Sequence, residues 1–90
     1  MQLNPISLAV ARTLAGLSQA ELSRRSKVSQ GYISGIEAGD KQASPEKLRQ
    51  LAIAIGVPIA ALITDPTPEQ LAAARESLSK NVPGTTALAS

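Results

Sequence analysis

The stretch between residues 18 and 39 constrains the fold more than any other, because it carries the start signals of two short helices in close succession. Ser18 begins a capping box, in which its side chain accepts from the backbone N–H of Glu21 and the glutamate side chain reaches back to Ser18. Ser29 is a good N-cap for a second helix, and Lys27 lies in the tight turn between the two. The stretch therefore predicts two short helices that pack against each other.

The second of these helices has one apolar and one polar face. Ile33 and Ile36 share the face that points inward. The outward face is short, polar and almost uncharged, and consists of Gln30, Gly31, Ser34 and Gly35. Two helices with such an exposed second face are the arrangement of a helix-turn-helix, whose second helix enters the major groove of DNA.

Three segments, in this order, resemble a known family. They are Leu17-Ser-Gln-Ala-Glu-Leu, Tyr32-Ile-Ser-Gly-Ile-Glu-Ala-Gly and Leu48-Arg-Gln-Leu-Ala-Ile-Ala-Ile-Gly-Val. Over roughly residues 6–63 the chain is similar to the lambda-repressor-like helix-turn-helix domain of phage repressors, Cro proteins and many small bacterial regulators. The resemblance implies an all-α fold, a five-helix DNA-binding domain to which this chain adds one C-terminal helix.

Composition limits the alternatives. Ninety residues, 43% of them hydrophobic, make one small domain, and with a single tyrosine as the only aromatic residue its core must be aliphatic. The absence of cysteine and histidine excludes a disulfide scaffold, the usual zinc sites and catalysis by a histidine base or cysteine nucleophile. No enzyme, cofactor or metal is therefore expected. No apolar run approaches the roughly 20 residues that span a bilayer, and no signal peptide is visible, so a cytoplasmic protein is expected.

The net charge of +2 is unevenly distributed along the chain. Residues 1–50 hold seven lysines and arginines against four acidic residues, whereas the remainder holds two against three. The positive excess therefore falls in the half that contains the two short helices, as nucleic-acid binding requires, although a solvated surface would explain the same pattern.

The helix signals divide the chain into a domain over residues 1–64, a helical element over 65–81 and a disordered tail over 82–90. The first helix starts at Asn4 and Pro5, ends near Ala15, and is expected to bury Ile6, Val10 and Leu14; two more helices cover about 19–26 and 30–38. A fourth starts after Ser44, buries Leu48, Leu51, Ala52 and Ile55, and closes at Gly56, and a short, mostly buried fifth covers 57–63. Thr67 and Gln70 form a second capping box, which starts a helix that runs to about residue 80.

The outward face of the second short helix supplies the candidate base contacts. Gln30 is the first candidate, because a glutamine amide can donate and accept together, which matches adenine N6 and N7. The family's usual readers correspond to Gln30, Gly31, Ser34 and Gly35, and two of these four are glycine here. Side-chain readout is therefore expected to be sparse, resting on Gln30, Ser34 and the neighbouring Ser29 and Tyr32, with Gly31 offering close backbone approach. Sequence-dependent DNA shape is then expected to supply a larger part of the specificity.

The resemblance also implies the phosphate contacts. Gln19, just inside a helix N-terminus, and Lys41 and Gln42, just after the reading helix, match positions that meet the DNA backbone in this family. Arg24 is a further candidate, although a solvated face would explain it equally well. For Tyr32 three roles stay open, in the core, on a phosphate or on a thymine methyl group.

One ion pair is implied as well. Arg12 and Glu37 match a pair that links the first and third helices of the family and so fixes the angle of the reading helix; Arg12 is also a candidate phosphate contact. The chain departs from the family at Lys27, where glycine is usual, and at Pro58, where a polar N-cap is usual. A left-handed backbone at Lys27 would cost about 1 kcal/mol.

The expected function is a sequence-specific DNA-binding transcriptional regulator, a repressor of the phage Cro or immunity type that occludes a promoter. Two alternatives remain: the DNA-binding antitoxin of a toxin–antitoxin pair, and a protein-interaction module that has lost DNA binding. One reading helix covers only a few base pairs, so a homodimer on an inverted repeat is expected. Its contacts are assigned to Leu71, Ala74 and Leu78, although packing on the chain's own domain is the alternative. The last residues, Ala87 to Ser90, resemble bacterial degradation tags.

Overall fold

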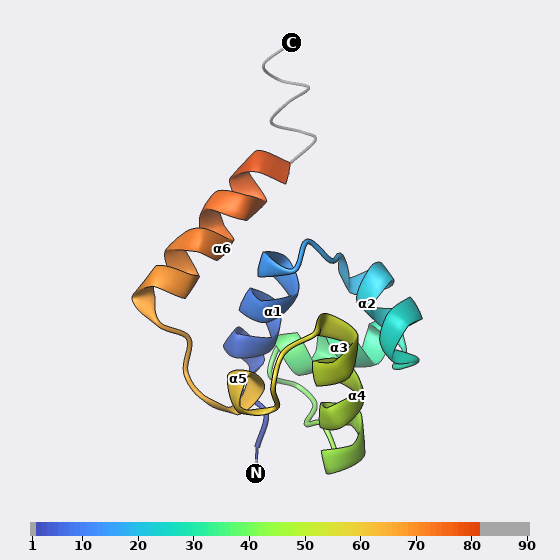
Figure 1. The fold of residues 1–90 in the computed structure, drawn as a ribbon. Helices are drawn as coiled ribbons and strands as arrows, with labels where there is room; N and C mark the ends of the chain where they lie inside the picture. Colours follow the sequence, from blue (N-terminus) through green and yellow to red (C-terminus); the bar gives the residue numbers. More distant parts are fainter. Residues whose placement is uncertain (1, 82–90) are drawn as a thin grey trace.

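The fold consists of six α-helices, of which the first five form a bundle and the sixth is appended to it (Figure 1). The computed structural model describes the backbone of residues 2–81 and the side chains of residues 2–76. The helices are α1 (Pro5–Leu14), α2 (Gln19–Ser26), α3 (Gln30–Glu37), α4 (Pro45–Ile55), α5 (Ala60–Ile63) and α6 (Pro68–Asn81). The all-α prediction is confirmed, since the described residues contain no strand. The expected disordered tail and the degradation-tag hypothesis concern residues that lie outside this range.

The predicted N-caps are present. Asn4 accepts from the N–H groups of Ile6 and Ser7, while Ser29 and Ser44 each accept from the N–H three residues later. These bonds satisfy amides that a helix leaves without an internal partner, so each helix begins where its cap residue stands.

The two capping boxes differ. Thr67 and Gln70 bond reciprocally, with N–H to side-chain distances of 2.9 and 3.1 Å. At the start of α2 only half of the predicted box exists: Ser18 accepts from Glu21 N–H at 3.0 Å, but the Glu21 carboxylate does not return to Ser18. It bonds Arg24 instead, because an arginine three residues along a helix offers a charged partner.

The core is aliphatic, as predicted. Its fully buried side chains come from α1 to α5 and the turn at residue 28, and the largest are Leu8, Leu22, Val28, Ile33, Ile36, Leu48, Leu51 and Leu62. Removing so much apolar surface from water is the main force that holds the helices together.

The face predicted for α1 is wrong at two of its three positions. Val10 is buried, but Ile6 and Leu14 are 58% and 44% exposed, and Leu8 lies in the core instead. The spacing of residues 6, 10 and 14 fits one side of a helix, yet the core lies on the side that carries Leu8 and Ala11.

The fifth helix is shorter and less buried than predicted. It spans four residues, and only Leu62 in it is fully buried, while Val57, Ile59 and Ile63 pack partly against the core. Ile59 holds the N-cap position without a side-chain bond, and the Pro58 carbonyl accepts from Ala61 N–H at 2.9 Å. With proline in place of a polar cap, the chain enters α5 through a turn instead of a longer helix.

The appended α6 lies along α1 of its own chain (Figure 1). Ala74 is its one buried side chain among those described, and Leu71 stays 38% exposed. The side chain of Leu78 lies outside the described residues. Of the residues assigned to a dimer contact, Ala74 is thus covered within the chain, whereas Leu71 remains open to solvent.

Candidate nucleic-acid interface

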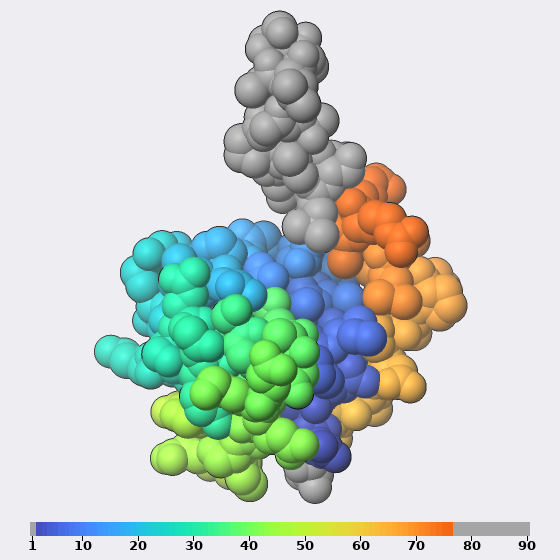
Figure 2. All heavy atoms as spheres, turned by 180° about the vertical axis from the view of Figure 1, so that it is seen from behind, coloured from blue at the N-terminus to red at the C-terminus, as the bar shows by residue number. Residues whose placement is uncertain are grey.

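The exposed side of α3 lies at the centre of an open face of the molecule, with α1 beside it and α6 at the edge (Figure 2). Ile33 and Ile36, at most 1% exposed, anchor the opposite side of α3 in the core. Gln30, Gly31 and Ser34 therefore face solvent, as predicted for base contacts. Ser29 is also exposed, but its hydroxyl already accepts from the N–H of Tyr32, which makes it the helix cap.

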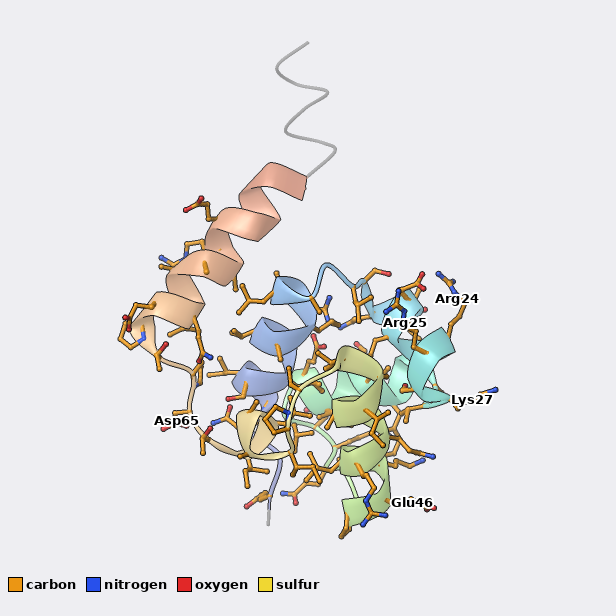
Figure 3. All side chains as sticks on the ribbon, in the orientation of Figure 1. Arg24, Arg25, Lys27, Glu46 and Asp65 are labelled. Atoms are coloured by element: carbon orange, nitrogen blue, oxygen red, sulfur yellow. The ribbon has the colours of Figure 1, made fainter. Side chains whose placement is uncertain are left out.

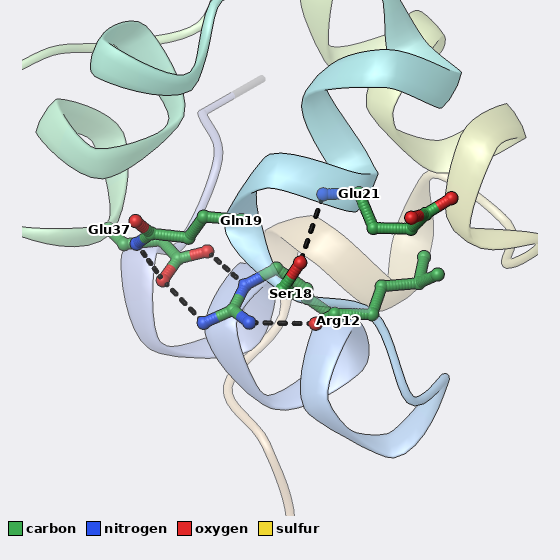
Figure 4. A network of polar contacts seen from close by, with 6 residues as sticks. Arg12, Ser18, Gln19, Glu21 and Glu37 are labelled. Carbon is green, nitrogen blue, oxygen red and sulfur yellow. Dashed lines mark hydrogen bonds and ion pairs between the residues drawn. The ribbon is translucent and has the colours of Figure 1, made fainter.

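Arg12 and Glu37 pair as predicted, in a bidentate arrangement between α1 and the end of α3 (Figure 4). Arg12 Nε donates to Glu37 Oε2 at 2.7 Å and Nη2 donates to Oε1 at 3.0 Å. The third nitrogen, Nη1, donates to the Leu17 carbonyl at 2.8 Å. The two side chains are only 15% and 10% exposed, so this pair fixes the direction of α3.

Gln19 belongs to the same network, which the sequence did not predict. Its Nε2 donates to Glu37 Oε1 at 3.1 Å, so one carboxylate binds both an arginine and a glutamine (Figure 4). Gln19, Gln30 and Arg12 also line one shallow hollow at the start of α2. The structure thus brings a predicted base contact and two predicted phosphate contacts together, although the guanidinium nitrogens of Arg12 are already engaged.

A second group of candidates surrounds Tyr32. Its hydroxyl donates to the Gln42 carbonyl at 2.6 Å, which ties α3 to the loop that follows it. The ammonium nitrogens of Lys41 and Lys47 lie 5.7 and 5.1 Å from the centre of the ring, within the range of cation–π attraction. Sequence reasoning did not single out Lys47, and its position one turn after the cap Ser44 was the available signal.

The predicted phosphate contact Arg24 lies apart from both groups. With Arg25 and Lys27 it extends into solvent from the end of α2, on the side of the molecule away from α6 (Figure 3). Glu21 pairs with both arginines, and the hydrogen bond and charge of Arg24 hold the pKa of its carboxyl below the ordinary value of 4.5. This pairing reduces the positive field that the end of α2 can offer to a phosphate.

The turn between α2 and α3 has the left-handed backbone considered for Lys27, with φ of 66° and ψ of 15°. Among the described residues it is the one non-glycine residue with positive φ. Its N–H donates to the Ser23 carbonyl at 2.9 Å and closes α2. The conformation sends Val28 into the core and starts α3 across α2.

The described residues hold no group of acidic, histidine or cysteine side chains that could bind a metal ion. None of the helices in this part of the chain is long and apolar enough to cross a membrane.

Comparison with models of protein families gives a match. A family model described as helix-turn-helix matches residues 8–62, which include all of α2, α3 and α4 and most of α1 and α5. The chain belongs to the lambda-repressor-like helix-turn-helix family. It is accordingly a DNA-binding transcription regulator, and α6 lies outside the part shared with the family. The search of curated proteins finds no matching relative.

Proposed function

We propose that this regulator is a sequence-specific repressor of the phage Cro or immunity type, which acts by occluding a promoter. The observation that carries the proposal is the mounting of α3: two core isoleucines and the Arg12–Glu37 pair hold it, while Gln30 and Ser34 face solvent. A rigid, polar, exposed helix can enter the major groove without rearrangement of the domain. Occlusion needs nothing beyond such binding, and its place of action is the cytoplasm, where the operator lies.

Direct readout in this proposal rests on the first turn of α3. Gln30 is exposed and free to pair with adenine N6 and N7, and Ser34 offers one hydroxyl a turn later. Gly31 lets the DNA approach the backbone closely, since no atom lies within 4 Å of its missing side chain. With so few reading side chains, DNA shape and deformability would supply the remaining specificity.

A homodimer on an inverted repeat completes the proposal. Two copies of α3 would lie about 34 Å apart on successive turns of one DNA face. Ile6 and Leu71, both exposed, line one groove between α1 and α6, and this apolar surface favours contact with a second copy. Leu71→Glu should then yield monomers in sedimentation, whereas Ala73→Glu, at an exposed position of the same helix, should leave the association state unchanged.

Selection of bound sequences from a random pool, followed by mutation, tests DNA reading. Gln30→Ala should weaken binding to the selected site by about 1–3 kcal/mol and relax the preference at one base pair. Gln50→Ala, an exposed glutamine on α4, is the control and should bind as the wild type does. If Gln30→Ala binds the selected site unchanged, α3 is not the reading helix.

Two other functions fit part of the molecule. The glycines at positions 31 and 35 leave few reading side chains, which favours an interaction module that has lost DNA binding; no salt-dependent binding to any DNA in the pool would support it. The added α6, with Leu71 exposed, favours a DNA-binding antitoxin. A gene for a small toxin beside the gene for this chain would distinguish that function from a phage-type repressor.

A further inference from the structure

The two glycines of α3 have different surroundings. A Cβ atom at Gly31 would meet nothing within 4 Å. At Gly35 it would lie 2.8 Å from Cδ of Lys41 and 3.0 Å from both Cγ and Cε. Side-chain carbons do not approach one another so closely, so the methylene chain of Lys41 occupies the space that a side chain at position 35 would need.

The backbone after α3 brings Lys41 into this position. The Gly35 carbonyl accepts from Asp40 N–H at 2.8 Å and from Lys41 N–H at 3.1 Å. Gly39, with φ of 85°, provides the left-handed residue that turns the chain back toward α3. Lys41 therefore starts beside Gly35, and its side chain, although exposed, runs over the helix.

The head of Lys41 ends at Tyr32, one turn before Gly35 on the same helix. The tyrosine ring is fixed by its hydrogen bond to Gln42, and the ammonium groups of Lys41 and Lys47 both lie within 6 Å of its centre. No carboxylate of residues 2–76 forms an ion pair with either lysine. Two cations without an ion-pair partner among the described residues are thus held near one ring at the edge of the reading face.

We propose that Gly35 is a positioning residue, whose missing side chain forms the notch that seats Lys41, so that Lys41 and Lys47 together bind phosphates of the DNA backbone. The inference rests on the proposed DNA-binding function and adds Lys47 and Gly35 to its interface. A lysine held in place by its stem loses less freedom on binding than a lysine in open solvent. Position 35 therefore has no side chain that could contact a base, but its glycine positions the cation of Lys41 at the interface.

The first test needs no DNA. Gly31→Ala should raise Tm, by at most about 4 °C in the first turn of the helix, because alanine is favoured over glycine in a helix and the position is open. Position 35 has a helical backbone that alanine can adopt. Gly35→Ala should nevertheless raise Tm less than Gly31→Ala, or lower it, because the side chain of Lys41 must move away from position 35. In a Lys41→Ala background, Gly35→Ala should recover the gain seen at position 31. Equal gains at both glycines in the wild-type background would overturn the notch.

The second test measures the slope of log K against log salt concentration on the selected DNA site. Each phosphate contact contributes about 0.9 to its magnitude, so Lys41→Ala and Lys47→Ala should each reduce it by about one unit. Gly35→Ala should reduce it similarly, with no further reduction when combined with Lys41→Ala, whereas Gln50→Ala, at an exposed position of α4 outside the proposed interface, should keep the wild-type slope. An unchanged slope for Gly35→Ala, or for Lys47→Ala, would overturn the proposal. Absence of any DNA binding by the wild type would instead refute the proposed function, and the Tm comparison would still report on the notch.

Discussion

The body formed by α1 to α5 and the appended α6 are held in place by very different amounts of packing. Helices α1 to α5 all contribute a side chain that is at most 1% exposed, whereas α6 contributes one alanine, 6% exposed, among its described residues. The body is therefore held together by many fully buried side chains, whereas α6 lies along α1 with one buried side chain among those described. This difference predicts that α3 keeps its orientation when α6 is released from α1.

The largest effect should come from the core of the body. Leu51→Ala removes a completely buried side chain of α4 and should cost about 2–5 kcal/mol of unfolding free energy, measured by urea denaturation. Ile53→Ala, on the same helix but 72% exposed, should change it by less than about 0.5 kcal/mol. Equal costs at the two positions would contradict the helix orientation on which the comparison depends.

Loss of the Arg12–Glu37 pair should come next. Arg12→Ala leaves a nearly buried carboxylate without its bidentate partner, and should cost about 3 kcal/mol, at the lower end for buried pairs. The control is Arg24→Ala, which breaks an exposed, solvent-screened pair and should change the unfolding free energy far less. A double-mutant cycle between positions 12 and 37 without coupling energy would show that the pair does not orient α3.

The packing of α6 on α1 should contribute less to the unfolding free energy than the core leucine or the ion pair. Ala74→Glu places a charge against α1 and should release α6, at a cost of about 1–2 kcal/mol, since little apolar area is lost. Hydrogen exchange should become fast in α6 while the amides of α1 to α4 keep their protection. Ala73→Glu, at an exposed position, is the control. A cost that matches Leu51→Ala would place α6 within the cooperative body.

The smallest effect concerns the strained turn of the body. Lys27→Gly should raise the unfolding free energy by about 1 kcal/mol, because glycine adopts positive φ without the steric cost of a Cβ atom. Lys27→Ala keeps the Cβ and removes the charge, so it should give no such gain. If alanine stabilises as much as glycine, repulsion among the cations of α2 is the cause, and backbone strain is not.

Local features of this fold could be predicted from the sequence, and those that depend on packing could not. The caps at Asn4, Ser29 and Ser44 follow from residues within three positions of one another, so their sequence suffices. The buried side of α1 could not be predicted in this way, because the spacing of residues 6, 10 and 14 is as compatible with a buried helix face as the side that carries Leu8. Packing of the other helices against α1 decides which side is buried.

The candidate site divides in the same way. Exposure of Gln30 and the Arg12–Glu37 pair could be predicted, one from helix periodicity and one from family resemblance. The bond from Gln19 to Glu37 depends on how the start of α2 approaches the end of α3, and the position of Lys41 on Gly35 depends on how the turn after α3 folds back. No spacing in the sequence encodes such an approach, because it arises from the conformations of intervening loops.

The two ends of the body are tied together where α6 departs. Asn4 caps α1, donates its N–H to the Leu62 carbonyl at 2.8 Å and donates its side-chain amide to Asp65, while the Ser7 hydroxyl donates to the Thr64 carbonyl. The chain thus enters and leaves the body formed by α1 to α5 at one cluster of hydrogen bonds. A segment joined to either end of the body would therefore be attached at nearly the same place on its surface.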